Sequence, residues 1–166
     1  MKYSIFLICI ISLSAFSCHK EEPGPGEIVD IGIDFILKNQ QGQDLLNNNT
    51  KNNLLNSEIK VYYLENGIER EVNNPDLDCP RNFCFVDQGN NNKIFRLFPV
   101  DKIVEKKSTI FIQWNSLQRD KIEANIVIKQ NGGNSNSYCD SVWVNGILKF
   151  PNLEFVPERK FIHIVE

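Results

Sequence analysis

The cysteines carry the most obvious chemistry in this chain. Cys9 lies inside an apolar N-terminal run, and Cys18 directly follows that run. In the remaining chain Cys79 and Cys84 bracket a short loop, and Cys139 is distant from both in sequence. In an oxidising compartment three such cysteines predict one disulfide and one remaining thiol. We expect a local Cys79–Cys84 bridge, with a bridge from either residue to Cys139 as the alternative.

Other chemistry at these thiols has less support. The Cys79–Cys84 spacing is not Cys-x-x-Cys, which argues against a thioredoxin-like role. Adding His163 to the three cysteines would complete a Cys₃His zinc set, but nothing in the spacing requires one. Asp76 and Asp78 lie in a turn-like segment without EF-hand spacing, so calcium is not expected either. We therefore predict neither a metal nor another cofactor.

Catalytic motifs are sparse. His163 is the only histidine beyond the N-terminal region, and it lies in a strand-like run without a neighbouring nucleophile motif. The chain has no Gly-x-Ser-x-Gly, no phosphate-binding loop and no dinucleotide fingerprint. We predict that the protein is not an enzyme, and a small hydrolase that uses His163 is the weakest hypothesis.

Aromatic side chains offer a better route to binding, because exposed rings stack on sugars or anchor protein partners. The candidates are Trp143, Trp114 and Tyr138, together with Tyr62 and Tyr63. Strict alternation along 138–144 puts Trp143 on one strand face with Ser141 and Cys139, and the two neighbouring valines on the other. This pattern allows a partly exposed Trp143, but a buried or half-buried tryptophan of a β-sandwich is the favoured interpretation.

Strands must position these side chains, because hydrophobic residues recur with a period of two. The runs 29–37 and 122–129 alternate in this way. In 110–114, three apolar side chains form one face, with Phe111 and Gln113 on the other. Further strand-like runs are 58–64, 68–72, 93–98, 138–144, 147–150 and 160–165.

Turn signals separate these runs. The pairs Asn66-Gly67 and Asn145-Gly146 favour tight hairpins, and other asparagines favour loops because they tolerate left-handed backbone conformations. About seven to nine short strands with such turns predict an all-β fold, either an antiparallel β-sandwich of immunoglobulin-like or similar type or a partly open barrel. The segment 39–56 is expected to be a loop, with a short helix at 44–46 as the alternative.

Length and composition agree with one small domain. The 166 residues are 42% hydrophobic and 23% charged, with a formal net charge of −3. These values argue against a disordered tail, a coiled coil and a multispan membrane protein. The mildly acidic charge argues against a nucleic-acid binder. We expect residues 28–166 to form the domain.

Residues 1–17 have the parts of a secretory signal peptide. Lys2 precedes the uncharged run 5–17, which is short against the roughly 20 residues of a membrane-spanning helix. We expect this run to be helical during export, and a short uncleaved anchor is the alternative. Residues 18–27 are charged and then rich in Pro and Gly, as in a flexible tether.

The boundary Ala15-Phe16-Ser17-Cys18 resembles a bacterial lipoprotein signal, in which a lipid is joined to the thiol of the new N-terminal cysteine. Ser17 fits that pattern, whereas Ala15 and Phe16 depart from the usual Leu and small residue. The resemblance implies lipidation at Cys18 and firm anchoring by several acyl chains. Ordinary cleavage after Ser17 is the alternative, and it would give a soluble protein that starts at Cys18.

The whole chain resembles short envelope lipoproteins of Bacteroides-like Gram-negative bacteria. The resemblance rests on short motifs: Cys18, Glu21-Glu22, the asparagine-rich loops, and the segments 42–46 and 142–146. Lys20-Glu21-Glu22 is also similar to a surface-export signal of that group. Asp140-Ser141-Val142 is similar to its short O-glycosylation acceptor motif, with Ser141 as the acceptor. These likenesses imply an outer-membrane location, on the cell surface or the periplasmic face.

Taken together, these features favour a binding role. We predict a non-enzymatic, lipid-anchored lipoprotein that presents a protein-interaction or structural surface. A carbohydrate-binding module at the cell surface is the alternative, carried by the aromatic candidates. The expected partners are the membrane, through the lipid, and envelope proteins or glycans, but not nucleic acid.

Overall fold

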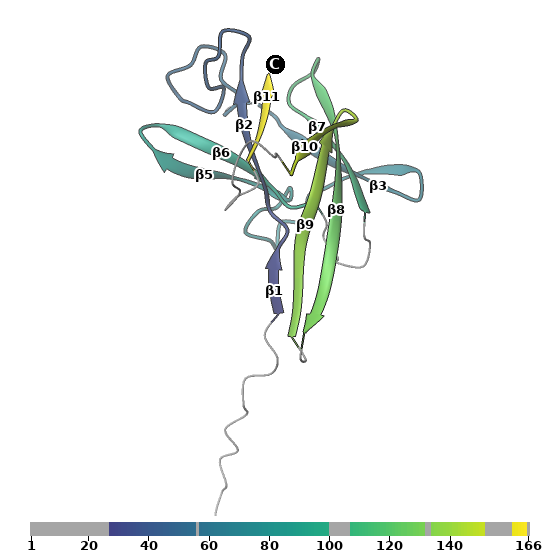
Figure 1. The fold of residues 1–166 in the computed structure, drawn as a ribbon. Helices are drawn as coiled ribbons and strands as arrows, with labels where there is room; N and C mark the ends of the chain where they lie inside the picture. Colours follow the sequence, from purple (N-terminus) through teal and green to yellow (C-terminus); the bar gives the residue numbers. More distant parts are fainter. Residues whose placement is uncertain (1–26, 56, 100–106, 132–133, 152–160, 166) are drawn as a thin grey trace, which may run out of the picture.

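The computed structural model describes residues 27–55, 57–99, 107–131, 134–151 and 161–165 (Figure 1). The expected signal peptide and most of the tether, Cys18 included, lie outside these residues. The described chain forms eleven strands and no helix. The helix considered at 44–46 is therefore absent, and turns occupy most of that segment.

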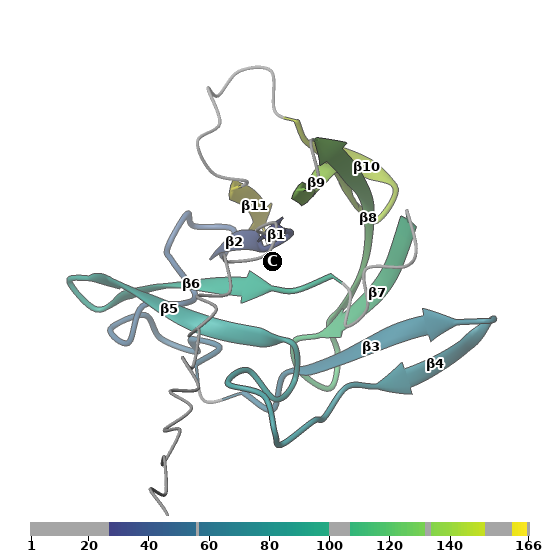
Figure 2. The same ribbon diagram turned by 90° about the horizontal axis from the view of Figure 1, so that it is seen from below.

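The strands form two sheets. The larger contains, in spatial order, β1 (Glu27–Asp30), β9 (Asn134–Val144), β8 (Arg119–Asn131), β7 (Lys107–Gln113), β3 (Lys60–Glu65) and β4 (Ile68–Glu71), and β10 (Ile147–Phe150) also pairs with β9. The smaller contains β11 (Phe161–Val165), β2 (Ile33–Lys38), β6 (Asn92–Leu97) and β5 (Phe83–Gly89). Figure 2 shows the larger sheet as a curved layer, with β2 and β11 on its inner side.

This arrangement confirms the all-β sandwich, with two parallel pairs in otherwise antiparallel sheets. β1 runs parallel to β9, and β11 runs parallel to β2. The run predicted as one strand over 29–37 is divided between β1 and β2, because the chain leaves the larger sheet for the smaller at Ile31 and Gly32. An alternating pattern alone does not record such a change of sheet.

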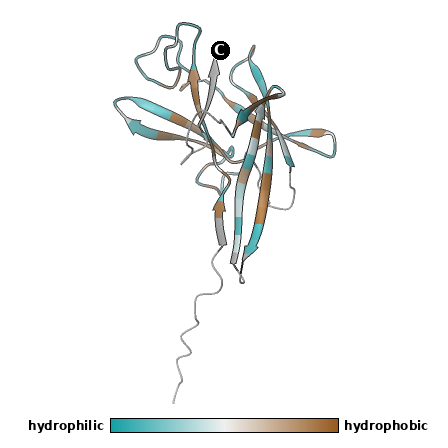
Figure 3. Ribbon diagram, in the orientation of Figure 1, coloured by the Kyte–Doolittle hydropathy of each residue, from teal (hydrophilic) through white to brown (hydrophobic). Residues whose placement is uncertain are grey.

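Apolar side chains from both sheets meet in a single core. Its fully buried members include Phe35, Phe95, Ile110, Ile112 and Trp114. The rings of Phe95 and Trp114 meet edge to face, with their centroids 4.9 Å apart. Figure 3 shows hydrophilic residues at the β5–β6 hairpin end, away from this core.

Strand β5 was missed by the sequence analysis, which treated its first residues as part of the cysteine loop. Phe83 stacks on Phe95 with a centroid distance of 4.6 Å, and Phe85 meets the same ring edge to face. The Phe-Cys-Phe-Val start of β5 shows little polar alternation, so only the pairing with β6 identifies it as a strand.

Asparagine shapes the turns as predicted. Every described non-glycine residue with a positive φ angle is an asparagine. In the β3–β4 hairpin, Asn66 has a φ angle of 51° and Gly67 one of 79°. In the β9–β10 hairpin, Asn145 and Gly146 have φ angles of 51° and 80°. Positive φ at both central residues is the requirement of a type I′ turn, which matches the twist of the flanking strands.

Candidate functional site

A disulfide joins Cys79 and Cys84, as expected from their short loop. Their Cα atoms are 5.5 Å apart, a normal distance for a bridge. The alternative partner, Cys139, lies buried in the core, and its thiol donates to the Ser141 carbonyl oxygen at 3.8 Å. The bridge therefore restrains the loop before β5 and leaves the central strands without a covalent link.

Trp114 is a core residue, so its assignment as a ligand-binding aromatic is corrected. Its side chain is fully buried, and its Nε1–H donates to Asp120 Oδ2 at 2.7 Å. The other oxygen of Asp120 accepts from Asn145 Nδ2 at 2.5 Å. This network fixes the indole beneath the β7–β8 turn, and the complete burial of the Trp114 side chain leaves it no surface for a ligand.

Tyr63 is likewise buried, whereas Tyr62 points to the opposite face of β3. The Tyr63 hydroxyl donates to the Phe98 carbonyl oxygen at 2.6 Å and accepts from Asn82 Nδ2 at 2.7 Å. Tyr62 is half-buried on the solvent side of the sheet, which we call the outer face.

A β-bulge in β9 changes which residues share a face. Asn125 pairs with Ser141 and Ile126 pairs with Cys139, so Asp140 is an extra residue. Cys139 consequently faces the core, while Ser141 lies on the outer face. The prediction that Cys139 shares a face with Trp143 was therefore wrong, because the bulge breaks the strict alternation on which it rested.

Trp143 itself is half-buried on the outer face, and Glu123 and Leu148 lie directly opposite it on the neighbouring strands. Lys107 Nζ lies 5.8 Å from the indole centroid, a cation–π contact. Leu148 is 51% exposed. We call Trp143, Leu148, Lys107, Lys121 and Glu123 the Trp143 patch.

Charges of both signs are paired within this patch. Glu123 Oε1 lies 3.1 Å from Lys107 Nζ and 3.4 Å from Lys121 Nζ. The hydrogen bond from Lys107 holds the pKa of Glu123 below its ordinary value, although partial burial acts in the opposite direction. The carboxylate therefore favours its ionised form, which pairs with both lysines, and Lys107 is the one that also contacts the indole.

Three further aromatic–cation pairs, formed by two cations, lie on the same outer face. The Lys129 ammonium is 5.3 Å from the Tyr138 ring centroid, which gives this predicted aromatic a defined position. Arg119 lies 4.4 Å from the Phe111 centroid and 5.3 Å from that of Tyr62. The outer face thus carries half-buried rings and cations from β3 to β9.

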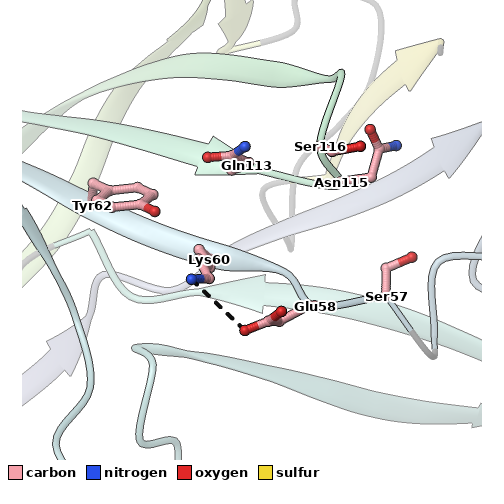
Figure 4. Close-up of a pocket in the computed structure, with 7 residues that line it drawn as sticks. All are labelled: Ser57, Glu58, Lys60, Tyr62, Gln113, Asn115 and Ser116. Carbon is pink, nitrogen blue, oxygen red and sulfur yellow. Dashed lines mark ion pairs between the residues drawn. The ribbon is translucent and has the colours of Figure 1, made fainter.

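A pocket opens beside Tyr62 (Figure 4). It is open to solvent, has a volume of about 520 Å³, and is lined from the β3 and β7 sides of the sheet. The lining residues are Ser57, Glu58, Lys60, Tyr62, Gln113, Asn115 and Ser116. We call it the Tyr62 pocket. Its lining combines the phenol ring of Tyr62, one ion pair, two amides and two serine hydroxyl groups.

The residues considered for metal binding, catalysis and glycosylation do not form a common site among the described residues. Asp76 and Asp78 are exposed in the loop after β4, and His163 belongs to β11, where its side chain lies outside the described part. Ser141 Oγ donates to Asp140 Oδ2 at 2.9 Å at the bulge. Among the described residues no group of three or more His, Cys, Asp or Glu side chains is arranged to hold a metal ion.

Sequence reasoning missed several of the outer-face residues. It recorded Phe111 and Gln113 only as the side opposite a buried face, and it gave Arg119 and Lys60 no role. Their positions follow from the antiparallel registers, in which Lys60 lies opposite Gln113 and Gln113 opposite Arg119. A test for aromatic or amide residues on the polar side of each strand would have found Phe111 and Gln113.

Neither a family model, nor a curated protein, nor a solved structure matches the chain. Among the described residues no helix has the length and apolar character needed to cross a membrane.

Proposed function

We propose that this protein is a non-enzymatic envelope lipoprotein, anchored through a lipid on Cys18, that binds a protein partner through the Trp143 patch. The observation that carries the proposal is the composition of this patch. A half-buried indole lies beside an exposed leucine and within a frame of paired charges. Tryptophan at the centre and charged groups at the rim are typical of the energetic centres of protein interfaces.

The patch is better suited to a protein than to a lipid surface. Lys107 and Lys121 share the single carboxylate of Glu123, so the patch has a net charge of only +1. Segments that bind anionic headgroups typically cluster about four to eight Lys or Arg residues. A protein partner that covers Trp143 and Leu148 would remove apolar surface from water while the paired charges stay at the edge. That arrangement gives affinity at the centre and orientation at the rim.

Anchoring at Cys18 would keep the domain close to the membrane. The segment between Cys18 and β1 spans at most about 30 Å when fully extended, at roughly 3.3–3.6 Å per residue. Strand β1 begins at Glu27, which pairs with Ser135 at the start of β9. A partner in the cell envelope is therefore within reach of the patch.

The anchoring is tested by labelling cells with an alkyne palmitate analogue and comparing the wild type with Cys18→Ala. We expect label on the wild type and none on the variant. Protease treatment of intact cells then distinguishes the two membrane faces, because only a surface domain is digested. Absence of label on the wild type would contradict the lipoprotein and support a soluble secreted protein.

The binding face is tested by a photo-crosslinking amino acid placed at Leu148 in the natural host. Leu77, which is 44% exposed in the loop after β4, is the matched control position. We expect one discrete adduct from position 148 that disappears when Trp143→Ala is added, and no such adduct from position 77. Equal adducts from both positions would refute a specific partner at the patch.

A further inference from the structure

The Tyr62 pocket is a second site on the outer face, separate from the Trp143 patch. Tyr62 lies on β3, and β7 and β8 lie between that strand and β9, which carries Trp143. At about 4.8 Å per strand, the two sites are roughly 14 Å apart. The volume of about 520 Å³ falls within the usual range of small-molecule sites. The pocket therefore merits a ligand assignment of its own.

Its charge argues for a neutral ligand. Lys60 is the only cation in the lining, and its Nζ lies 3.7 Å from Glu58 Oε1 and 3.8 Å from Glu71 Oε2. A phosphate or sulfate group would meet one ammonium in the lining, and that ammonium is already paired with Glu58 and Glu71. A divalent cation would find a single carboxylate in the lining, already beside Lys60 (Figure 4). Both polyanions and metal ions are therefore disfavoured.

Its hydrogen-bonding groups argue for a ligand rich in hydroxyl groups. The side chains of Gln113, Ser57 and Ser116 make no hydrogen bond to any described residue. A carboxamide both donates and accepts, and so does a hydroxyl, which matches the alternating donors and acceptors of a polyol. No aliphatic side chain lines the pocket, so an apolar ligand would gain little.

Its aromatic wall is held in place from one side. Arg119 lies 5.3 Å from the Tyr62 ring centroid, and its Nη2 forms an ion pair of 2.5 Å with Glu69 Oε2. The ring is therefore oriented before a ligand arrives, which lowers the entropy that binding must overcome. A fixed aromatic ring beside amides and hydroxyls is suited to the apolar face and polar rim of a sugar.

We infer that the Tyr62 pocket binds a neutral saccharide, with Tyr62 against the sugar ring and Gln113 bonded to its hydroxyl groups. The site is independent of the protein partner proposed for the Trp143 patch. Either assignment therefore stands if the other fails.

The test is a titration of the full-length, ¹⁵N-labelled protein with four neutral probes: maltotetraose, cellotetraose, mannotetraose and chitotetraose. The detergent that keeps the full-length protein in solution must have no sugar headgroup, because such a headgroup would compete with the probes for the pocket. We expect at least one probe to shift the side-chain amide signals of Gln113 and Asn115. Gln113→Ala should weaken that binding by about 10-fold, the effect of one lost hydrogen bond.

Gln130→Ala is the matched control, since Gln130 is an exposed amide near the far end of β8. It should leave the dissociation constant within about 2-fold of the wild-type value. The inference is overturned if no probe, at a concentration of about 10 mM, shifts the Gln113 signals, because even a very weak complex would be populated there. It is also overturned if the binding observed is unchanged by Gln113→Ala, or if only an anionic oligosaccharide or a peptide competes for the pocket.

Discussion

The two tryptophans of this protein belong to the same sheet but lie in opposite environments. Trp114 directly follows β7, and Trp143 lies in β9. Trp114 faces inward, is fully buried, and has its N–H bonded to Asp120. Trp143 faces outward, is half-buried, and lies beside Lys107. Trp114 has its apolar surface covered and its polar atom paired, as a core residue must. Trp143 retains uncovered apolar surface, which is what a binding residue needs.

The same contrast extends along both sides of the larger sheet. On the inner side, the buried polar side-chain atoms of the described residues all have hydrogen-bond partners, with the single exception of Ser137 Oγ. On the outer side, the Gln113 amide is available, and rings alternate with cations. The inner side therefore supplies stability, and the outer side supplies groups that await a partner.

The sharpest test of this division is chemical labelling on either side of the β-bulge. Cys139 should react with a maleimide at least about 100-fold more slowly in the native protein than in denaturant, because labelling requires the core to open. Ser141→Cys, made together with Cys139→Ser, should label readily in the native state. Peptide mapping by mass spectrometry measures both rates. Fast native labelling of Cys139 would contradict the bulge.

The next largest effect is expected from alanine at each tryptophan. Trp114→Ala should lower the free energy of unfolding by about 3–5 kcal/mol, because it empties a packed site and leaves Asp120 with one fewer donor. Trp143→Ala should cost less than about 1.5 kcal/mol, because part of that indole is already in water. Urea denaturation measures the difference, and equal losses would remove the contrast.

A smaller loss is expected from the disulfide, which lies outside the core. The bridge joins residues only five apart, and a loop of that size contributes about 2 kcal/mol through the entropy of the unfolded chain. The double variant Cys79→Ser and Cys84→Ser should lose about that amount in urea denaturation. It should still protect Cys139 from maleimide. Loss of that protection would make the bridge a requirement for the core.

The smallest effect is a pH dependence in the Trp143 patch. The hydrogen bond from Lys107 lowers the pKa of Glu123 from its ordinary value of 4.5, so the folded state binds this proton less readily than the unfolded state does. The resulting stability is present above about pH 4.5 and is lost as the pH falls through the lowered folded-state pKa.

Glu123→Gln should therefore flatten the fall in stability between about pH 6 and pH 3, by less than about 1 kcal/mol for such a surface pair. Urea denaturation at the two pH values measures this change. Asp87→Asn, which changes an exposed carboxylate at the β5–β6 hairpin end, is the control. An identical pH dependence in wild type and Glu123→Gln would show that the Lys107–Glu123 contact contributes nothing.

The sequence by itself determined the features that depend on neighbouring residues. Alternation predicted most strands, Asn-Gly pairs predicted two hairpins, and the short spacing of Cys79 and Cys84 predicted their bridge. Each depends on backbone preferences or contacts within a few residues, which sequence order records directly.

The tertiary structure alone decided the features that depend on strand pairing. The extra residue Asp140 in the bulge directs the side chain of Cys139 toward the core. Pairing with β6 is what makes the segment Phe83–Gly89 a strand. Pairing of β3 with β7 brought Lys60 beside Gln113 and formed the Tyr62 pocket from segments far apart in sequence. These outcomes depend on register, and a shift of one residue exchanges the two faces of a strand.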